Sequence, residues 1–177
     1  MFVLASVGTD HHPFDRFVEW TEAWKAAHPD FKVFTQFGTT KREPSAPAER
    51  YVEGHELESM FDLADAVVCH GGPSTIMEAR SRGHLPIVIP RNPAFGEHVD
   101  EHQMRFARFM ADKRTILLAE TQEQLFEHLE SVLFRGARDD SSFTDASNTH
   151  ARVGAIVADL VARPCRPLFG ATKSKRN

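Results

Sequence analysis

The sequence predicts an α/β fold in which helices cover both faces of a parallel sheet. Short apolar runs alternate with longer segments whose apolar residues recur at helical spacing, from the first residues to about residue 134. The run 66–69 has no polar alternation, which predicts a strand buried on both sides, as in parallel sheets. Ligands of such sheets bind at the carboxyl ends of the strands, so a functional site is expected in the loops that follow them.

The first half of the chain has clear signals for two helices. Aromatic residues recur at helical spacing across 14–24, and Pro29 ends that helix. The apolar residues of 56–64 follow i, i+3, i+4, i+7, which predicts a short amphipathic helix. The charged segment 38–50 contains two prolines and is predicted to be an exposed loop. The strands predicted in this half are 2–7, 31–36, 51–52 and 66–69.

In the second half, proline, glycine and capping residues mark the ends of the predicted helices. Pro73 stands at the first position of a helix that runs to residue 82, and Gly83 follows as its cap. Thr121 and Gln124 form a capping box that opens a helix to residue 134. The other predicted elements are strands 86–89 and 115–119, helices 99–112 and 149–163, and the loops 92–96 and 135–148. We expect one domain over 1–163 and a basic, flexible tail over 164–177.

Composition excludes several classes of protein. The chain has 177 residues and a formal net charge of -4, so it lacks the basic footprint of a nucleic-acid binder. No apolar run approaches the ~20 residues that a membrane-spanning helix needs. Met1 leads straight into apolar residues without a basic segment, unlike a secretory signal. Cys69 and Cys165 are too few for a disulfide framework, which favours a cytoplasmic location, and Cys69 is expected to be an inert strand thiol.

The strongest local signal is the segment 67–78, where a buried strand ends in two glycines and a helix begins. Glycines let an anionic group approach the backbone, and the free N–H groups of a helix start favour phosphate. Ser74 and Thr75 add hydroxyl donors, and Glu78, one turn on, could accept hydrogen bonds from a ribose. An ordinary strand-to-helix turn with a solvated Glu78 fits these residues about equally well.

The run His70-Gly71-Gly72-Pro73-Ser74-Thr75, followed by Glu78, resembles the nucleotide-sugar motif of GT-B glycosyltransferases. In particular, it is similar to the donor-binding, C-terminal domain of glycosyltransferase family 28, in which Ala often stands at the position of Pro73. Segments 3–9, 36–38 and 96–103 resemble other family motifs in the same order, so the resemblance covers about residues 1–134. It implies a Rossmann-like sheet equivalent to the C-terminal half of a GT-B enzyme.

The same resemblance implies roles for individual residues in binding a UDP-sugar. No metal or other cofactor is required, because backbone donors and a helix start can stabilise the leaving UDP. The implied contacts are Gly8 and Thr9 on the diphosphate, Gln36 after the second strand, the backbone near Gly54 and His55 on the uracil, Gly71, Gly72, Ser74 and Thr75 on phosphate, Glu78 on the ribose, and His102 and Gln103 on the transferred sugar.

The chain begins directly with the donor-domain strand, as do the donor subunits of two-subunit transferases, of the bacterial exopolysaccharide type or the eukaryotic dolichol-linked N-acetylglucosamine type. This implies a membrane-associated partner subunit that binds a lipid-diphosphate-linked acceptor, with little transfer by this chain alone. The general base of an inverting transfer is expected on that partner. His11 and His12 are the local candidates, and His12 is the one we single out. The sugar could be N-acetylglucosamine, glucose or glucuronic acid, whose carboxylate Arg91 could pair with.

Two alternatives remain from the residues themselves. His98-Val99-Asp100-Glu101-His102 fits the H-x-x-E-H pattern of zinc peptidases, in which two histidines one helical turn apart hold the ion and a glutamate acts as base. A polar helix start that reaches a sugar is the favoured interpretation of this segment. The second alternative is a non-catalytic nucleotide-binding module, because donor binding and catalysis use the same residues.

Overall fold

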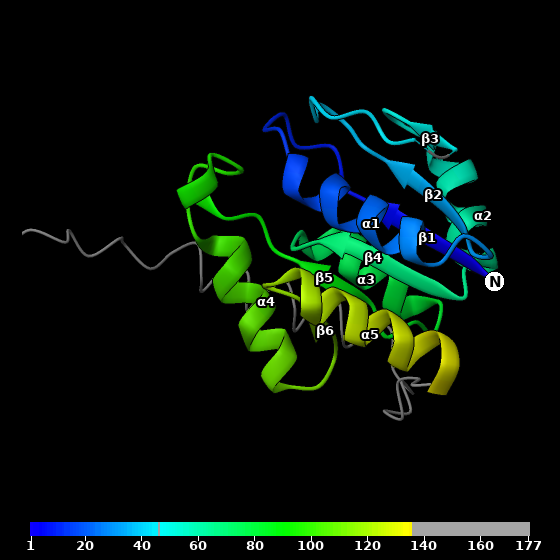
Figure 1. Cartoon of the computed structure of the whole chain (residues 1–177). Coiled ribbons are helices and arrows are strands. Elements are labelled where there is room, and N and C mark those ends of the chain that lie inside the picture. The colour runs from blue at the N-terminus through cyan, green and yellow to red at the C-terminus, as the bar shows by residue number, and fades with distance from the viewer. Residues whose placement is uncertain (46, 136–177) are drawn as a thin grey trace, which may run out of the picture. The chain divides into compact units, whose positions relative to one another are not determined.

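A computed structural model describes residues 1–45 and 47–135 (Figure 1). Six strands form one parallel sheet in the order β3-β2-β1-β4-β5-β6. The predicted loop 135–148 is described only at Arg135, and the predicted helix 149–163 and tail 164–177 lie outside the described residues. The strands are β1 (Phe2–Ser6), β2 (Lys32–Gln36), β3 (Ala48–Glu49), β4 (Ala66–His70), β5 (Ile87–Ile89) and β6 (Leu117–Leu118).

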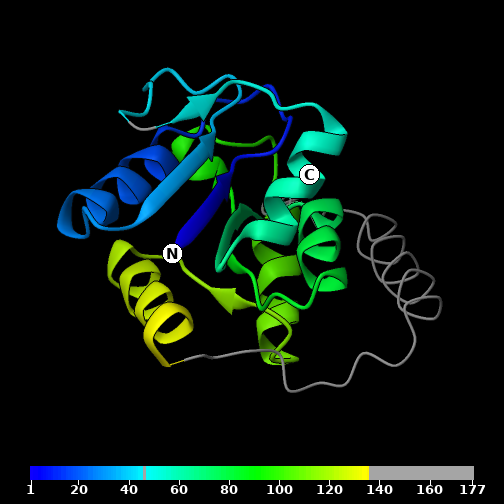
Figure 2. The same ribbon diagram turned by 90° about the vertical axis from the view of Figure 1, so that its right-hand side faces the viewer.

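The direction in which the sheet is built reverses between β1 and β4. Strand β1 pairs with β2 on one side and with β4 on the other, so the loops after β1 and β4 leave the sheet side by side (Figure 2). In an open parallel sheet this switch point opens a crevice beyond the carboxyl ends of the two strands. The order 3-2-1-4-5-6 is that of the Rossmann fold and confirms the predicted fold class.

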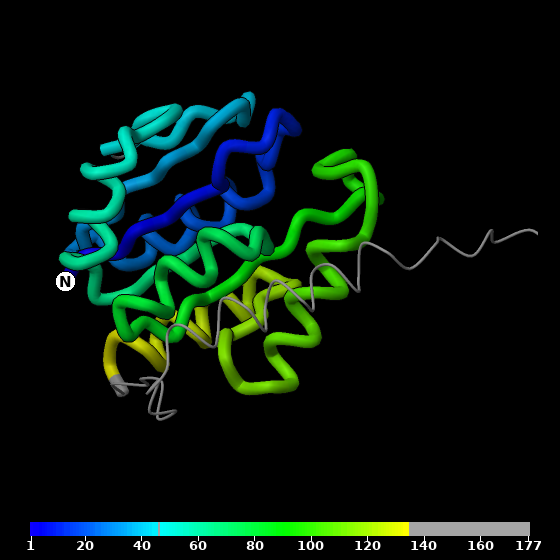
Figure 3. The backbone as a smooth tube through the Cα atoms, turned by 180° about the vertical axis from the view of Figure 1, so that it is seen from behind, coloured from blue at the N-terminus to red at the C-terminus, as the bar shows by residue number. Residues whose placement is uncertain are grey.

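Helices cover both faces of the sheet, as predicted. Figures 1 and 3 show α1 (Asp15–Ala27) and α5 (Gln122–Arg135) on one face. The opposite face carries α2 (Gly54–Leu63), α3 (Pro73–Ser81) and α4 (His102–Asp112). The core on the first face is built from Val3, Ala5, Val7, Phe14, Phe17, Trp24, Val68, Ile87, Ile89, Leu125 and Leu129, all buried. No helix in the described part of the chain is long and apolar enough to cross a membrane.

The helix caps predicted from sequence are formed. Gly83 has φ +82 and follows α3, where its N–H donates to the carbonyl of Arg80 at 2.9 Å and the next N–H, of His84, donates to Ala79 at 3.1 Å. This left-handed turn suits glycine. At the start of α5, Thr121 Oγ1 accepts from the Gln124 N–H, and Gln124 Oε1 accepts from the Thr121 N–H, both at 3.3 Å.

Two predicted boundaries are wrong by three residues. Smaller differences are the strand predicted at 115–119, which is Leu117–Leu118, and a 3-10 helix, Pro93–Phe95, in the predicted loop 92–96. The short edge strand is Ala48–Glu49 rather than 51–52, because pairing with Thr35 and Gln36 of β2 defines it, whereas the apolar Tyr51 is half exposed. Helix α4 begins at His102 rather than at residue 99. The Asp100 carboxylate accepts the His102 N–H at 2.9 Å, so the chain makes a side-chain-capped turn before it enters the helix.

Candidate functional site

A cavity of about 330 Å³ lies at the carboxyl ends of β1, β2 and β4, where the topology places the crevice. Seven residues predicted from the sequence line it, and four more that the sequence interpretation missed complete it. The predicted ones are Gly8, Thr9, Gln36, Gly72, Ser74, Thr75 and Gln103. The additional ones are Ser6, Asp10, Leu57 and His70, beside Pro73.

Two other cavities lie away from this edge. One, of about 350 Å³, is lined by Met1, Asp65 and the start of β4, so it sits at the amino ends of the strands. The other lies along the outer side of α1, between Glu19 and Pro29. Neither contains a residue of the predicted motifs, and neither lies where parallel sheets bind ligands. The cavity at the carboxyl ends is therefore the candidate site.

The loop after β1 turns sharply at Gly8. Its φ of +74 places it in the left-handed region, which favours glycine. Its N–H donates to Ser6 Oγ at 3.2 Å, and its carbonyl accepts from Gln36 Nε2 at 3.2 Å. Gln36 is 2% exposed, and this hydrogen bond from its side chain links the end of β2 to the loop after β1.

The imidazole of His70 lies between the two glycine loops. A Cβ atom added to Gly8 would lie 2.3 Å from Cε1 of His70, and one added to Gly72 would lie 2.2 Å from Nε2. Both distances are far inside van der Waals contact. Gly71 meets a different neighbour, because its Cβ would lie 3.0 Å from the Cβ of Gln103. A side chain at Gly8 or Gly72 would therefore force the His70 ring to move, whereas one at Gly71 would make a tight contact with Gln103.

His70 is neutral at physiological pH. Its side chain is buried, and burial together with the positive charge of Arg91 lowers the pKa of the imidazole to about 4. A neutral ring can pack between two backbone segments without the cost of desolvating a charge. His70 thus lines the cavity as an uncharged ring packed between the two glycine loops.

Helix α3 points its first turn at the cavity. Gly72 is the N-cap residue, and Pro73 follows at the first helical position, as predicted. The N–H groups of Ser74 and Thr75 have no backbone acceptor among the described residues, as is usual in a first helical turn. Two backbone donors, two hydroxyls and the positive end of the helix dipole therefore face the same space, which suits an anionic group.

Five residues with expected ligand roles lie beside the cavity rather than in its lining. Gly54 and His55 are exposed at the start of α2, although Leu57 of that helix does line the cavity. Glu78 lies one turn beyond Ser74, and its carboxylate pairs with Arg82. Gly71 is buried behind Gln103, and His102 pairs with Asp100. The contacts of these five residues with a ligand remain predictions.

Arg91 is completely buried beneath the loops. Its guanidinium donates to the carbonyl of Val7 at 3.0 Å, of His12 at 2.7 Å and of Glu97 at 3.1 Å. Burial lowers the pKa of this guanidinium, and the charges of Asp10 and Glu97 oppose that shift. The expectation that Arg91 pairs with a glucuronate carboxylate is wrong, because its side chain is inaccessible and its donors serve the backbone.

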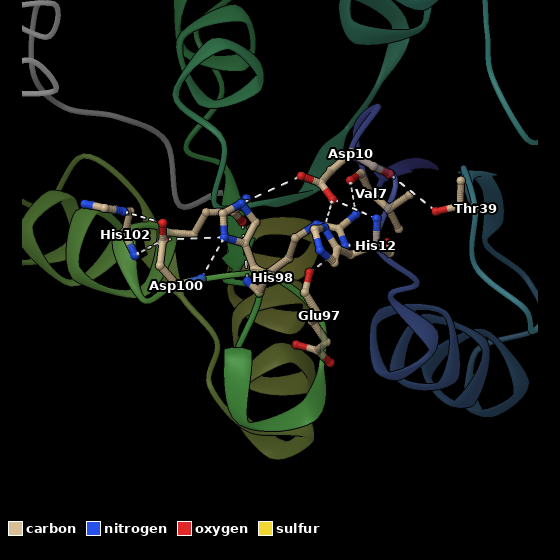
Figure 4. A network of polar contacts seen from close by, with 10 residues as sticks. Val7, Asp10, His12, Thr39, Glu97, His98, Asp100 and His102 are labelled. Carbon is tan, nitrogen blue, oxygen red and sulfur yellow. Dashed lines mark hydrogen bonds and ion pairs between the residues drawn. The ribbon is translucent and has the colours of Figure 1, made fainter. Parts of the chain in front are cut away.

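Imidazoles and carboxylates alternate in a row of side chains that includes the cavity-lining Asp10 (Figure 4). His12 Nδ1 lies 2.7 Å from Asp10 Oδ1, and Asp10 Oδ2 lies 3.7 Å from His98 Nε2. His98 Nδ1 lies 3.4 Å from Asp100 Oδ1, and Asp100 Oδ2 lies 2.8 Å from His102 Nδ1. This row of side chains joins the loop after β1 to the segment that leads into α4.

This arrangement does not support the zinc-peptidase alternative. Residues 98–101 precede α4, so His98 and His102 are not one turn apart on a helix. Asp100 lies between their rings, and each imidazole faces a carboxylate. Within the described ranges, the one group with metal-ligand spacing is Asp10, His11 and His12, whose ligand atoms lie within 4.8 Å of one another.

Sequence reasoning missed Asp10 and His70 for different reasons. Asp10 stands between Thr9 and the two histidines, so its position after the first strand was a usable signal. His70 appeared only as part of a motif. The position of its ring between the two glycine loops depends on the pairing of β1 with β4. Cys69 is buried as expected, and burial raises the pKa of its thiol to about 12.

Comparison with known proteins gives consistent results. The model of the glycosyltransferase family 28 C-terminal domain matches residues 2–158, which extends beyond the expected 1–134. An N-acetylglucosamine transferase of Aromatoleum aromaticum, which acts on N-acetylmuramyl-(pentapeptide) pyrophosphoryl-undecaprenol, is 31% identical over 137 residues. That alignment covers 74% of this chain and 37% of the relative. The transferase of the same name from Burkholderia pseudomallei is 29% identical over 118 residues, covering 67% of this chain and 31% of the relative.

Solved structures share the fold. Acinetobacter baumannii MurG superposes with a TM-score of 0.57 at 16% identity, over 90% of this chain and 52% of that one. The glycotransferase of kitacinnamycin superposes with a TM-score of 0.55 at 19% identity, over 91% of this chain and 39% of that one. The chain thus spans about a third of the length of the curated relatives it matches. On the match over residues 2–158, this chain belongs to the glycosyltransferase family 28 C-terminal domain family.

Proposed function

We propose that this chain is the donor-binding subunit of an inverting glycosyltransferase. It would move a sugar from a UDP-sugar to a lipid-diphosphate-linked acceptor in exopolysaccharide or glycolipid synthesis. The observation that carries the proposal is the shared cavity of two glycine loops and the start of α3, at the switch point of the sheet. Family membership supports it, as do relatives whose names specify a UDP-linked donor and a pyrophosphoryl-undecaprenol acceptor.

The diphosphate of the donor would lie across the first turn of α3. Ser74 and Thr75 offer backbone N–H and hydroxyl donors there, and Gly8 and Thr9 face the cavity from the other loop. As the bond to the sugar breaks, negative charge develops on the leaving UDP, and these fixed donors stabilise it without rearrangement. In this proposal no metal is needed for that stabilisation.

The remaining parts of the donor would extend to either side of the diphosphate. The uracil would reach the start of α2, near Gly54, His55 and the cavity-lining Leu57. The ribose would bind Glu78, whose carboxylate is oriented by its pairing with Arg82. The transferred sugar would contact Gln103, which lines the cavity, and His102 beside it.

The acceptor would bind to a separate, membrane-associated subunit. This part of the proposal rests on the resemblance to two-subunit transferases. The chain would work at the cytoplasmic face of a membrane, peripherally through its partner, and would transfer little sugar alone. The relatives are about three times longer than the aligned segment, so their complete activity is not assumed for this chain by itself.

Titration of the EDTA-treated full chain with UDP in a calorimeter tests the donor site. We expect binding without metal, and a loss of about tenfold in affinity for Glu78→Ala, because two ribose hydroxyls lose a charged acceptor. Glu127→Ala, an exposed substitution on α5, is the control and should bind as the unaltered chain does. Absence of UDP binding, or equal binding by Glu78→Ala, would contradict the assignment.

A non-catalytic nucleotide-binding module would give the same titration. A transfer assay distinguishes the two functions. It uses membranes from the source organism that lack this gene and are supplemented with the purified chain. Transfer from radiolabelled UDP-glucose, UDP-N-acetylglucosamine or UDP-glucuronic acid to lipid is expected for the transferase. If UDP binds and none of the three donors is used, the binding module becomes the better description.

A further inference from the structure

We propose that His12 is the general base of the transfer reaction and that Asp10 is its positioning residue. The inference rests on the proposed function and adds to it, because it places the base in this chain rather than in the partner subunit. Asp10 lines the donor cavity, and His12 follows it on the same loop. The sequence alone offered His12 only as a local candidate, and it gave no role to Asp10.

The contact between the two side chains fixes which ring nitrogen carries hydrogen. Asp10 Oδ1 lies 2.7 Å from His12 Nδ1 and also accepts the His12 backbone N–H at 2.8 Å. Burial would raise the pKa of the Asp10 carboxyl, but the hydrogen bonds from His12 and the charge of Arg91 hold it below its usual value. The ionised carboxylate can only accept, so Nδ1 must donate and Nε2 keeps its lone pair.

The Nε2 atom of His12 is available to a substrate. It makes no hydrogen bond to any residue of 1–45 or 47–135, and 21% of the side chain is exposed. The neighbouring His11 packs its ring 4.0 Å from that of His12 and is itself exposed. An imidazole with Nδ1 on a carboxylate and a free Nε2 is the arrangement that general bases use to take a proton from a hydroxyl.

The pair is held in place from two further directions. Arg91 donates to the carbonyl of His12 at 2.7 Å, so a buried side chain fixes the loop from below. On its other side, Asp10 Oδ2 lies 3.7 Å from His98 Nε2. Each oxygen of Asp10 thus faces an imidazole nitrogen. The carboxylate cannot turn without losing one of these contacts.

In the proposed step, one bond forms and one bond breaks at the anomeric carbon of the donor sugar. The acceptor hydroxyl gives its proton to His12 Nε2, and its oxygen forms a bond to the anomeric carbon of the donor sugar. The bond between that carbon and the UDP oxygen breaks, and the electron pair leaves with UDP. The imidazolium formed on His12 is stabilised by the Asp10 carboxylate and later releases its proton to water.

Transfer assays with matched variants test the role of His12. The assay uses the supplemented membranes described above, with saturating UDP-sugar. His12→Gln should lower the transfer rate by about 100-fold or more, because a positioned base contributes that much, while UDP affinity stays unchanged. Glu127→Gln, an exposed substitution on α5, should leave both quantities unchanged. Equal transfer by His12→Gln and the unaltered chain would overturn the proposal.

The ring tautomer provides a test that does not depend on turnover. In ¹⁵N spectra of the full chain with labelled histidine, His12 should carry hydrogen on Nδ1 at a pH where it is neutral. Asp10→Asn should abolish this preference and lower transfer, with donor affinity retained. A His12 ring with hydrogen on Nε2 would overturn the base assignment whatever the transfer assay gives.

These outcomes separate the base pair from the function on which it rests. If the unaltered chain binds UDP and transfers no sugar, the transferase proposal fails, and the tautomer still decides the geometry of the pair. If transfer by the unaltered chain is abolished by EDTA, a metal on Asp10, His11 and His12 would use the same atoms. That result would overturn the role of His12 as a free base.

Discussion

Arg16 of α1 and Glu97 of the loop after β5 form a two-point ion pair across 81 residues of sequence. Arg16 Nε lies 2.9 Å from Glu97 Oε1, and Arg16 Nη2 lies 2.8 Å from Oε2. Glu97 is almost fully buried and also accepts the Asn92 N–H at 2.8 Å. The loop that leads to Gln103 is therefore anchored on the helix that follows the first glycine loop.

We expect Glu97→Gln to destabilise the chain by about 3 kcal/mol, because it leaves a partly buried guanidinium without its counter-charge. Urea denaturation measures the change in free energy of unfolding. Glu120→Gln is the control, since Arg108 also donates two hydrogen bonds to Glu120, both to Oε1, but this pair is exposed. It should cost less than about 1 kcal/mol. Equal effects of the two substitutions would contradict a structural role for burial at Glu97.

Gly72→Ala should destabilise the chain and weaken UDP binding, because the new Cβ would occupy the position of the His70 ring. Overpacking of this kind costs about 1–3 kcal/mol. The double variant His70→Ala, Gly72→Ala should lose less stability than the sum of the single variants, since the ring that causes the clash is gone. Additive losses in a double-mutant cycle would show that Gly72 is constrained by something other than His70.

Stability should rise with pH between about 4 and 6.5 through His70. The pKa of His70 is lowered to about 4 in the folded chain, below the ordinary value of 6.5. The unfolded chain binds the extra proton in this interval, so protonation favours unfolding as the pH falls. The full effect is about 3 kcal/mol at 1.36 kcal/mol per pKa unit. Denaturation of the unaltered chain and of His70→Gln at pH 7 and 4 measures most of this effect, and parallel pH dependence would exclude His70 as the source.

Cys69 should be unreactive in the folded chain, because burial raises the pKa of its thiol to about 12 and keeps it from solvent. The test uses Cys165→Ser, which leaves Cys69 as the remaining thiol. A thiol reagent should label this variant no faster than the chain opens, and promptly in urea. Rapid labelling of the native variant would mean that β4 is accessible from the site.

The fold could be predicted from sequence because its signals are local and strong. The apolar run 66–69 lies in the buried strand β4. The turn at Gly83 ends α3, and the capping box at Thr121 begins α5, as their residues predict. The edge strand β3 could not be placed in this way. Its position depends on backbone pairing with β2, and this pairing does not require Ala48 or Glu49 to be hydrophobic.

The sequence predicted many individual residues of the candidate site, but not the contacts between residues that are distant in sequence. Glycines, hydroxyls and Gln103 carry recognisable patterns, and the structure brings seven of these residues into one cavity. The roles of His70 and Arg91 depend on neighbours that are distant in sequence, as the contacts to Gly8 and to Val7 show. Such contacts leave no periodicity or motif by which one sequence could reveal them.

The burial of Arg91 has a consequence for how the site should respond to its ionic surroundings. Dissolved salt screens charges at a protein surface over about 8–10 Å at physiological ionic strength, but ions cannot approach a guanidinium enclosed by three backbone carbonyls. Its charge also acts on Asp10 and His70, which line the cavity. The effect of Arg91 on these two groups should therefore depend less on salt concentration than the effect of a surface lysine would.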